Sequence, residues 1–494
     1  IPLLIQMLVG MAHASMDRRH ALRSPQRRNF RLFLISQVTS QSGTWLQVVA
    51  LAWLVSELTG GGAALGWVAV ATFGPLLVLG PWTGALADRV DKHRLLIATQ
   101  LLVVGQAAAL GAVVLAGVGT VAVVYALTLA YGVLHAFENP VRRAFVAELV
   151  GEDRIARAVS LNSAISAAGR VLGPLAAGVL IASASIGWCF ILNAVSHLVA
   201  LVVLLLIRRD ALHITEAARE PGAARAGLRY AWSVPDLRIA LLLTGVVATF
   251  GFNHQVLIPL LAHQTFDGGV ATYILLYTAI TAGSVFGALA VARVREIELR
   301  FLAGAIIAFA LANGLIALSP SVALAAVAGF ATGATALFFL TASSALLQQR
   351  CAPEMRGRVM ALSAMVLLGG LPIGAPLVGW IADLAGPRTA VAVGSMAAVL
   401  AGTVVLRRLR TATAIRPGLG ETLSSAEPDR RPNDSSNEQQ PCHAAPSRSS
   451  TWAATDQRSL AAPDPQVRQE SRIISSIRKP TRLSTVAPMP TNAR

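Results

Sequence analysis

The chain has 494 residues, of which 54% are hydrophobic and only 13% are charged, and its mean hydropathy is +0.61. These values exclude an ordinary soluble enzyme and indicate a membrane protein with many spans. The net charge of +16 does not predict a nucleic-acid partner, because the basic residues lie in short clusters between apolar runs. Their expected partners are the anionic headgroups of the lipid bilayer.

The N-terminal segment, 1–28, combines a short apolar stretch with a basic one. Residues 1–15 begin without a methionine, are apolar for only about ten residues and follow no basic region, so they do not predict a signal peptide. We expect them to be a fragment or a start-site artefact, with Met16 as the candidate start. The arginines that follow predict a cytoplasmic N-terminus.

Twelve apolar runs follow, each close to the roughly 20 residues that a helix needs to cross a hydrocarbon core about 30 Å thick. Lysine or arginine lies in every connection after an even-numbered run, whereas the connections after odd-numbered runs have none apart from Arg388. This alternation predicts twelve membrane helices, with both termini in the cytoplasm. The runs are 32–55, 64–87, 95–116, 120–137, 156–182, 187–207, 237–262, 270–292, 300–318, 321–347, 357–383 and 387–407.

The two halves of the chain share a sequence repeat. Gly-Ala-Leu-Ala at 84–87 recurs at 287–290, and in each half it ends the second run. Such repeats are typical of a secondary transporter built from two parallel halves, with the substrate cavity between them at mid-membrane. The predicted fold is an all-α membrane protein of twelve transmembrane helices in two six-helix pseudo-symmetric bundles, 29–207 and 237–409. A glycine pattern repeats as well, with Gly169, Gly173 and Gly178 matched by Gly370, Gly374 and Gly379.

Two further segments are polar. Residues 208–236 predict a partly amphipathic cytoplasmic linker at the membrane interface. Residues 410–494 are rich in Ser, Pro, Thr, Asn and Arg with few large apolar residues, which predicts a disordered tail. The three cysteines lie far apart in dissimilar contexts and predict neither a disulfide framework nor a metal cluster.

Motifs of enzymes and ATP-driven motors are missing from the sequence. There is no Gly-x-x-x-x-Gly-Lys-Ser/Thr loop, no His-x-x-x-His pair and no Gly-x-Ser-x-Gly elbow. We therefore expect no enzyme activity, no cofactor and no metal, and any transport must be passive or driven by a gradient.

A charged hinge joins the second and third runs. Gly84 permits close approach of a neighbouring helix, and Arg89, Lys92 and Arg94 hold the loop at the cytoplasmic side. Asp88, at the inner end of the second helix, can accept hydrogen bonds from a helix N-terminus and pair with an arginine. This predicts a conformational latch; the alternative is that the hinge only sets the topology.

The partners of Asp88 are expected in the next basic connection, which carries Arg142 and Arg143. Val291 stands at the corresponding position of the second half, so the latch is predicted to be asymmetric.

The fifth run contains closely spaced glycines, a proline and an arginine. Gly169 and Gly173, four residues apart, let two helices touch backbone to backbone, as Gly178 does further on, and Pro174 allows a bend. Arg170 is costly inside an apolar helix unless it faces water, a carboxylate or a substrate. Two interpretations stay open: binding of an anionic group or support of the cavity, and pairing with a group such as Glu138 or with backbone carbonyls.

Polar residues of the first and seventh runs predict the lining of the cavity. Gln37, Gln41 and Thr44 recur at helical spacing, which favours a face turned away from lipid. Glu138, at the inner end of the fourth run, is either a cavity group or an anion at the cytoplasmic rim. The remaining candidates are Trp45, Asn253 and His254, the last more typical of a packing donor than of a proton carrier.

The hinge Gly-x-x-x-Asp-Arg-x-x-x-x-Arg resembles the loop signature of the major facilitator superfamily, and the segment from Gly169 to Gly178 looks like the antiporter motif of its exporters. Together with 49–60, 138–145 and 158–163, these motifs make residues 29–409 similar to the enterobactin-exporter-like, or transmembrane secretion effector, group. The resemblance implies efflux of a drug or siderophore, usually by proton antiport, through a monomer in the bacterial inner membrane. It also implies that Asp88 latches onto the start of the eleventh helix, near Gly357.

The sequence departs from the superfamily in one respect: the arginine of the fourth helix linked to proton transfer is absent from 125–135. Proton coupling is therefore expected from the resemblance alone. The predicted function is secondary active export of a small amphipathic organic molecule by alternating access. Two alternatives stay open, an uptake carrier or facilitator on the same fold and a non-transporting membrane receptor or adaptor that uses the tail.

Overall fold

The structure is a computed structural model, and it describes residues 25–87, 90–150, 155–211, 223–291, 293–294 and 296–415, which belong to one compact unit. The predictions for 1–15, for the tail beyond residue 415, and for Asp88 and Arg89 lie outside the described residues.

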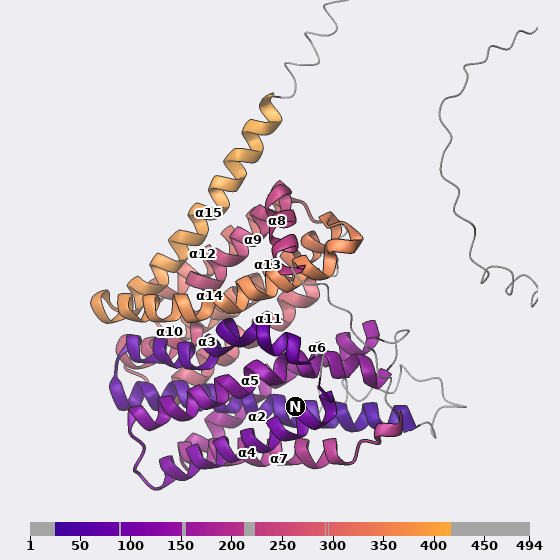
Figure 1. Ribbon diagram of the computed structural model, residues 1–494. Coiled ribbons are helices and arrows are strands. Elements are labelled where there is room, and N and C mark those ends of the chain that lie inside the picture. Colours follow the sequence, from indigo (N-terminus) through magenta and orange to yellow (C-terminus); the bar gives the residue numbers. More distant parts are fainter. Residues whose placement is uncertain are drawn as a thin grey trace, which may run out of the picture. The chain divides into compact units, whose positions relative to one another are not determined.

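All regular structure in the described residues is helical (Figure 1). Each predicted run overlaps one helix or, for 237–262, a series of helical segments. The helices of the first half are α2 (Pro25–Thr59), α3 (Gly62–Ala87), α4 (Lys92–Leu115), α5 (Val121–Val150), α6 (Ile155–Ser183) and α7 (Ile186–Leu205). Those that follow are α8 (Ala223–Ser233), α9 (Pro235–Val246), α10 (His254–Leu260), α11 (Val270–Val291), α12 (Leu299–Leu318), α13 (Val322–Arg350), α14 (Arg356–Ala385) and α15 (Pro387–Ile415).

Eleven helical segments of the described chain are long and apolar enough to cross a membrane. The prediction of an all-helical protein with many membrane spans is therefore confirmed. α2 is not among the eleven, because its many polar residues lower its hydropathy.

The seventh run, 237–262, lies in one candidate membrane span, Pro235–Thr265, but this span is not one regular helix. π-helical turns at Val247–Gly251 (η3) and Leu261–Thr265 (η4) flank α10, and the chain breaks at Phe252 and Asn253. Pro259 inside α10 has no N–H to donate, which removes a hydrogen bond one turn back. π-turns of this kind place backbone and side chains off the regular helical register, frequently at functional sites.

The connections between helices gather at two ends. We call the end with the α3–α4 and α13–α14 connections the basic end, and the opposite end, with the α2–α3 and α14–α15 turns, the neutral end. α3 and α14 lie antiparallel along each other, because Gly62 contacts Gly379 near the neutral end while Leu77 contacts Gly369 further along.

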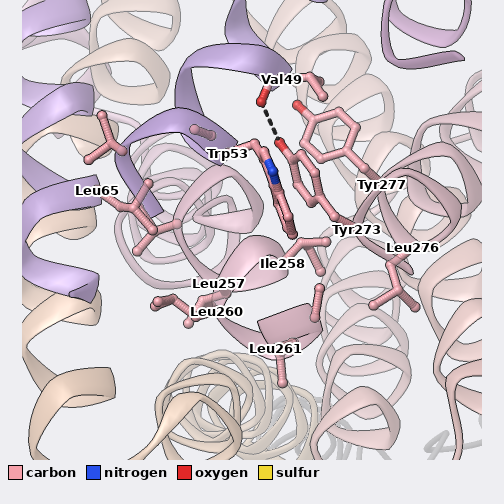
Figure 2. Close-up of a cluster of buried hydrophobic side chains, with 14 of the residues drawn as sticks. Val49, Trp53, Leu65, Leu257, Ile258, Leu260, Leu261, Tyr273, Leu276 and Tyr277 are labelled. Carbon is pink, nitrogen blue, oxygen red and sulfur yellow. Dashed lines mark hydrogen bonds between the residues drawn. The ribbon is translucent and has the colours of Figure 1, made fainter. Parts of the chain in front are cut away.

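The apolar core is shared at the neutral end and divided at the basic end. One buried cluster at the neutral end combines residues of α2 and α3 with residues of α10, α11 and α14. Trp53, Leu65, Leu257 and Tyr273 meet there (Figure 2). Towards the basic end, one cluster contains only residues between Phe33 and Ile207 and another only residues from Ala231 onward.

α6 and α14 carry the repeated glycines and make the same kind of contact. A Cβ built on Gly169 or Gly173 would meet the backbone of α2, and one on Gly370 or Gly374 would meet the backbone of η3. The third glycine of each set reaches the other half: Gly178 touches Ile274 of α11, and Gly379 touches Gly62 of α3. The two sets of contacts correspond helix by helix.

Candidate functional site

The described part of the hinge is tied to its own half of the chain. Lys92 pairs with Glu148 at the end of α5, at 2.8 Å. Asp91 caps α4 by accepting the N–H of Arg94 at 3.0 Å, and it also pairs with the side chain of Arg94 at 3.2 Å. Burial opposes ionisation of Asp91, but the N–H of Arg94 and the charge of Arg209 outweigh it and lower the pKa of this carboxyl. Lys92 and Arg94 thus fix the start of α4, and Gly84 lies in the last turn of α3.

Arg142 and Arg143 have different environments. Arg142 forms a buried ion pair with Glu138, one turn earlier in α5, and donates to Oε1 of Gln37 at 3.2 Å. The suggested pairing of Arg170 with Glu138 is therefore wrong. Glu138 is only 3% exposed, so it is not an anion at the rim either. Arg143 is exposed.

A chain of hydrogen bonds extends from this ion pair through the first half. The amide of Gln100 donates to Glu138, so its oxygen accepts from Nδ1 of His197, 2.8 Å away. Nε2 of His197 then accepts the hydroxyl of Thr44, at 3.3 Å. A small cavity beside this network is lined by Gln37, Gln100 and Arg142 among others. We call Gln37, Thr44, Gln100, Glu138, Arg142 and His197 the polar network.

The predicted polar face of the first run is thus turned mainly towards its own half. Gln37 faces α5, Thr44 faces α7, and Gln41 packs against Gly169 of α6. The sequence analysis singled out neither Gln100 nor His197, although each is a strongly polar residue in an otherwise apolar run.

Arg170 lies in the middle of α6, outside the polar network. Its guanidinium stands 5.2 Å from the ring centroid of Trp45 on α2. Nε of Arg170 is buried without a hydrogen-bond partner, and no carboxylate among the described residues pairs with this arginine. Tyr277 of α11 lies near enough to Arg170 to interact with its charge, and Gln255 of α10 lies next to Tyr277.

Asn253 and His254 lie at the break between η3 and α10. Asn253 is 2% exposed and donates to the carbonyl of Thr249 at 2.7 Å, while its Oδ1 has no partner within the described chain. His254 lies beside Asn313 of α12. The break therefore places hydrogen-bonding groups inside the second half, where a regular helix would have only apolar ones.

The neutral end is closed by a carboxylate that the sequence reasoning did not single out. Asp383, near the end of α14, accepts the N–H of Gly62 on one oxygen and that of Ala63 on the other, the latter at 2.8 Å. It thus satisfies two free N–H groups at the start of α3 and lies at the positive end of that helix dipole.

Further contacts close the same end. The hydroxyl of Tyr273 donates to the carbonyl of Val49 at 3.2 Å, and Trp53 stacks on Tyr273 with ring centroids 5.4 Å apart (Figure 2). His263 stacks on the other side of Trp53, at 4.3 Å. Gln264 donates to the carbonyl of Gly60 at 2.9 Å. We call Val49, Trp53, Gly60, Gly62, His263, Gln264, Tyr273 and Asp383 the neutral-end seal.

Comparison with protein families gives one match over most of the chain: the model of the transmembrane secretion effector family matches residues 21–417. The "Staphyloferrin A transporter" of Staphylococcus aureus (strain NCTC 8325 / PS 47) is 28% identical, over 51% of this chain and 64% of that protein. The "Enterobactin exporter EntS" of Salmonella typhi is 29% identical, over 52% and 62%. The chain thus covers less than two thirds of these two relatives.

A longer match and a solved structure agree with this. The "Multidrug efflux pump Tap" of Mycolicibacterium fortuitum is 27% identical, over 77% of this chain and 96% of that protein. The fold is similar to that in the crystal structure of the nucleoside transporter NupG (D323A mutant), with a TM-score of 0.63, 11% identity, and coverage of 77% of this chain and 99% of that one.

Proposed function

Because the chain belongs to the transmembrane secretion effector family of the major facilitator superfamily, as its motifs predicted, we propose that it exports a small amphipathic organic molecule by alternating access. The chain is a membrane transporter and not an enzyme. The proposal adds a substrate of the drug or siderophore kind, since relatives are named for such cargoes. It also adds proton coupling, a monomer, and an inner-membrane location with both termini in the cytoplasm.

One observation carries the proposal: the apolar core is joined across the two halves at the neutral end and divided at the basic end. A transporter that alternates between two states needs one end closed while the other gives access. The basic end is the cytoplasmic one by the distribution of lysine and arginine. In this state an exporter would load its substrate from the cytoplasm.

The proposal includes twelve spans in two six-helix bundles, with α2 as the twelfth. The polar residues that lower the hydropathy of α2 are largely engaged with its neighbours, as Gln37 is with Arg142 and Gln47 with Asn193 at 2.7 Å. Such internal satisfaction makes a polar helix compatible with the bilayer. The matching glycine contacts of α6 and α14 support two halves built alike.

We propose Asp88 as the latch of the opposite, outward-facing state. It follows α3 in the sequence, and its expected partner is the start of α14 near Gly357. A Cβ built on Gly357 meets no atom of the described residues within 4 Å, which leaves room for a partner there. In this proposal Lys92 and Arg94 hold the loop, and Arg143 is the partner cation of Asp88, since Arg142 is already paired with Glu138.

Everted membrane vesicles test the direction and the coupling. We expect at least one fluorescent dye from a set that includes the anion fluorescein and the cation rhodamine 6G to accumulate inside vesicles that contain the protein and to leave when a protonophore is added. Equilibration without a gradient would instead indicate a facilitator, and no movement of any compound in a panel of antibiotics, dyes and siderophores would indicate an adaptor. Asp88→Asn should slow accumulation at equal expression, and an unchanged rate in that variant would remove the latch from the proposal.

A further inference from the structure

The positive and negative charges in the middle of the membrane helices are unequal in number. Among the described residues, the charged side chains that lie away from the helix ends and are not exposed are those of Glu138, Arg142 and Arg170. Glu138 and Arg142 neutralise each other in the polar network. Arg170 has no carboxylate partner there, and its Nε is buried without a hydrogen bond. An unpaired charge in the middle of a membrane helix is strongly unfavourable, so the site is incomplete as it stands.

The groups around Arg170 do not neutralise its charge, but they can bind a ligand. The indole of Trp45 lies against the guanidinium, which leaves the edge with the N–H donors available for another group. Tyr277 and Gln255, which lie next to each other, add a hydroxyl and an amide. These four residues come from α6, α2, α11 and α10, and so from both halves of the chain.

The site lies on the inner side of the neutral-end seal. Gly178, where α6 touches Ile274 of α11, is about two turns from Arg170, or about 12 Å along the helix. Tyr277 packs edge-on against Tyr273 of the seal, with ring centroids 5.9 Å apart (Figure 2). A molecule that enters from the divided, basic end would therefore reach Arg170 and stop at the seal.

We propose that Arg170 binds the anionic group of the transported molecule, a carboxylate, sulfonate or phenolate, and that Trp45 packs against an aromatic or apolar part next to it. The planar fork of an arginine matches such a group with two parallel hydrogen bonds. Bound substrate thus supplies the missing negative charge. This inference rests on the proposed function and narrows it: amphipathic organic anions are substrates, and cations of similar size are disfavoured because they would meet an unpaired arginine.

Two dyes with related ring systems and opposite charge test the site, the anion fluorescein and the cation rhodamine 6G. With the purified full-length chain we expect fluorescein to bind more tightly than rhodamine 6G, measured by fluorescence anisotropy. Arg170→Gln should weaken fluorescein binding about tenfold or more, since a hydrogen-bonded charge is lost, without weakening rhodamine 6G. Arg170→Lys keeps the charge but not the fork, so it should keep the preference for the anion with lower affinity.

Arg408→Gln is the matched control, since Arg408 is an exposed arginine on α15 and should leave both affinities unchanged. Fluorescein binding that is absent in the wild type, or that survives in Arg170→Gln, would overturn the inference. If Arg170→Gln fails to fold, Arg170→Lys and the charge preference of the wild type decide. If the wild type transports rhodamine 6G in vesicles but does not bind fluorescein, the inference fails and the proposed function stands. If the wild type transports no compound at all, the proposed function itself fails.

Discussion

At the residue scale, the charged side chains of the described helices that lie away from the helix ends and are not exposed are paired, with Arg170 as the exception. The sequence placed Glu138 at the inner end of the fourth run, Arg142 in the connection that follows and Arg170 inside the fifth run. It did not show which arginine the carboxylate would meet. Glu138 and Arg142 are four residues apart and so lie on one face of a helix. That spacing favoured their pairing, whereas Gln100 and His197 come from other helices and had no local signal.

The polar network predicts a large cost for removing one of its charges. Glu138→Gln leaves Arg142 buried and uncompensated, and we expect it to destabilise the protein by about 3–5 kcal/mol. The double variant Glu138→Gln, Arg142→Met removes both charges and should recover much of that stability. Thermal unfolding in detergent measures the effect. Glu298→Gln breaks an exposed pair with Arg300 and should change little; an equal loss in both single variants would contradict the prediction.

At the scale of helices, the positions of the membrane segments could be predicted and their contacts could not. Apolar runs and the alternation of basic connections located the helices, because both follow from the needs of a bilayer. They do not show which face meets another helix, since lipid and helix partners are equally apolar. The role of Asp383 was missed for this reason, because Gly62 and Ala63, whose N–H groups it accepts, are distant in the sequence.

Asp383 should control the stability of the neutral-end seal. Asp383→Asn removes the charge and one of the two oxygens that accept from the start of α3. We therefore expect the free energy that favours the closed neutral end to fall by about 1–2 kcal/mol. Spin labels at Leu58 and Leu384, both exposed at this end, should show a larger share of long distances in the variant.

The matched control is Asp267→Asn, also at the neutral end. Asp267 is exposed and has a positive φ of 48°, a conformation that asparagine accepts well. Its distance distribution should equal that of the wild type. A distribution for Asp383→Asn that also equals the wild type would mean that the apolar contacts alone hold the seal.

At the scale of the whole molecule, the transporter interpretation makes the segment after α15 dispensable for transport. A chain that ends at Ile415 keeps every described helix. We therefore expect deletion of 416–494 to leave the initial rate of dye accumulation in vesicles within about twofold of the wild type, a difference of less than about 0.5 kcal/mol in activation free energy. Loss of cellular function on this deletion, together with a full-length chain that transports no compound in vesicles, would favour the adaptor instead.

The antiparallel pairing of α3 and α14 has a consequence for how the two states are balanced. Asp383, near the end of α14, accepts hydrogen bonds from the start of α3. Asp88 follows α3 in the sequence, and its proposed partner is the start of α14. In the proposed cycle the contact of Asp383 with α3 and the contact of Asp88 with α14 cannot form at the same time. The ratio of the two states therefore depends on the difference between the free energies of these two contacts. Neutralising Asp383 should then shift the equilibrium towards the outward-facing state, and neutralising Asp88 should shift it towards the state with the neutral end closed. Neutralising both should bring the ratio of the two states back towards that of the wild type, with faster exchange because each state has lost one stabilising contact.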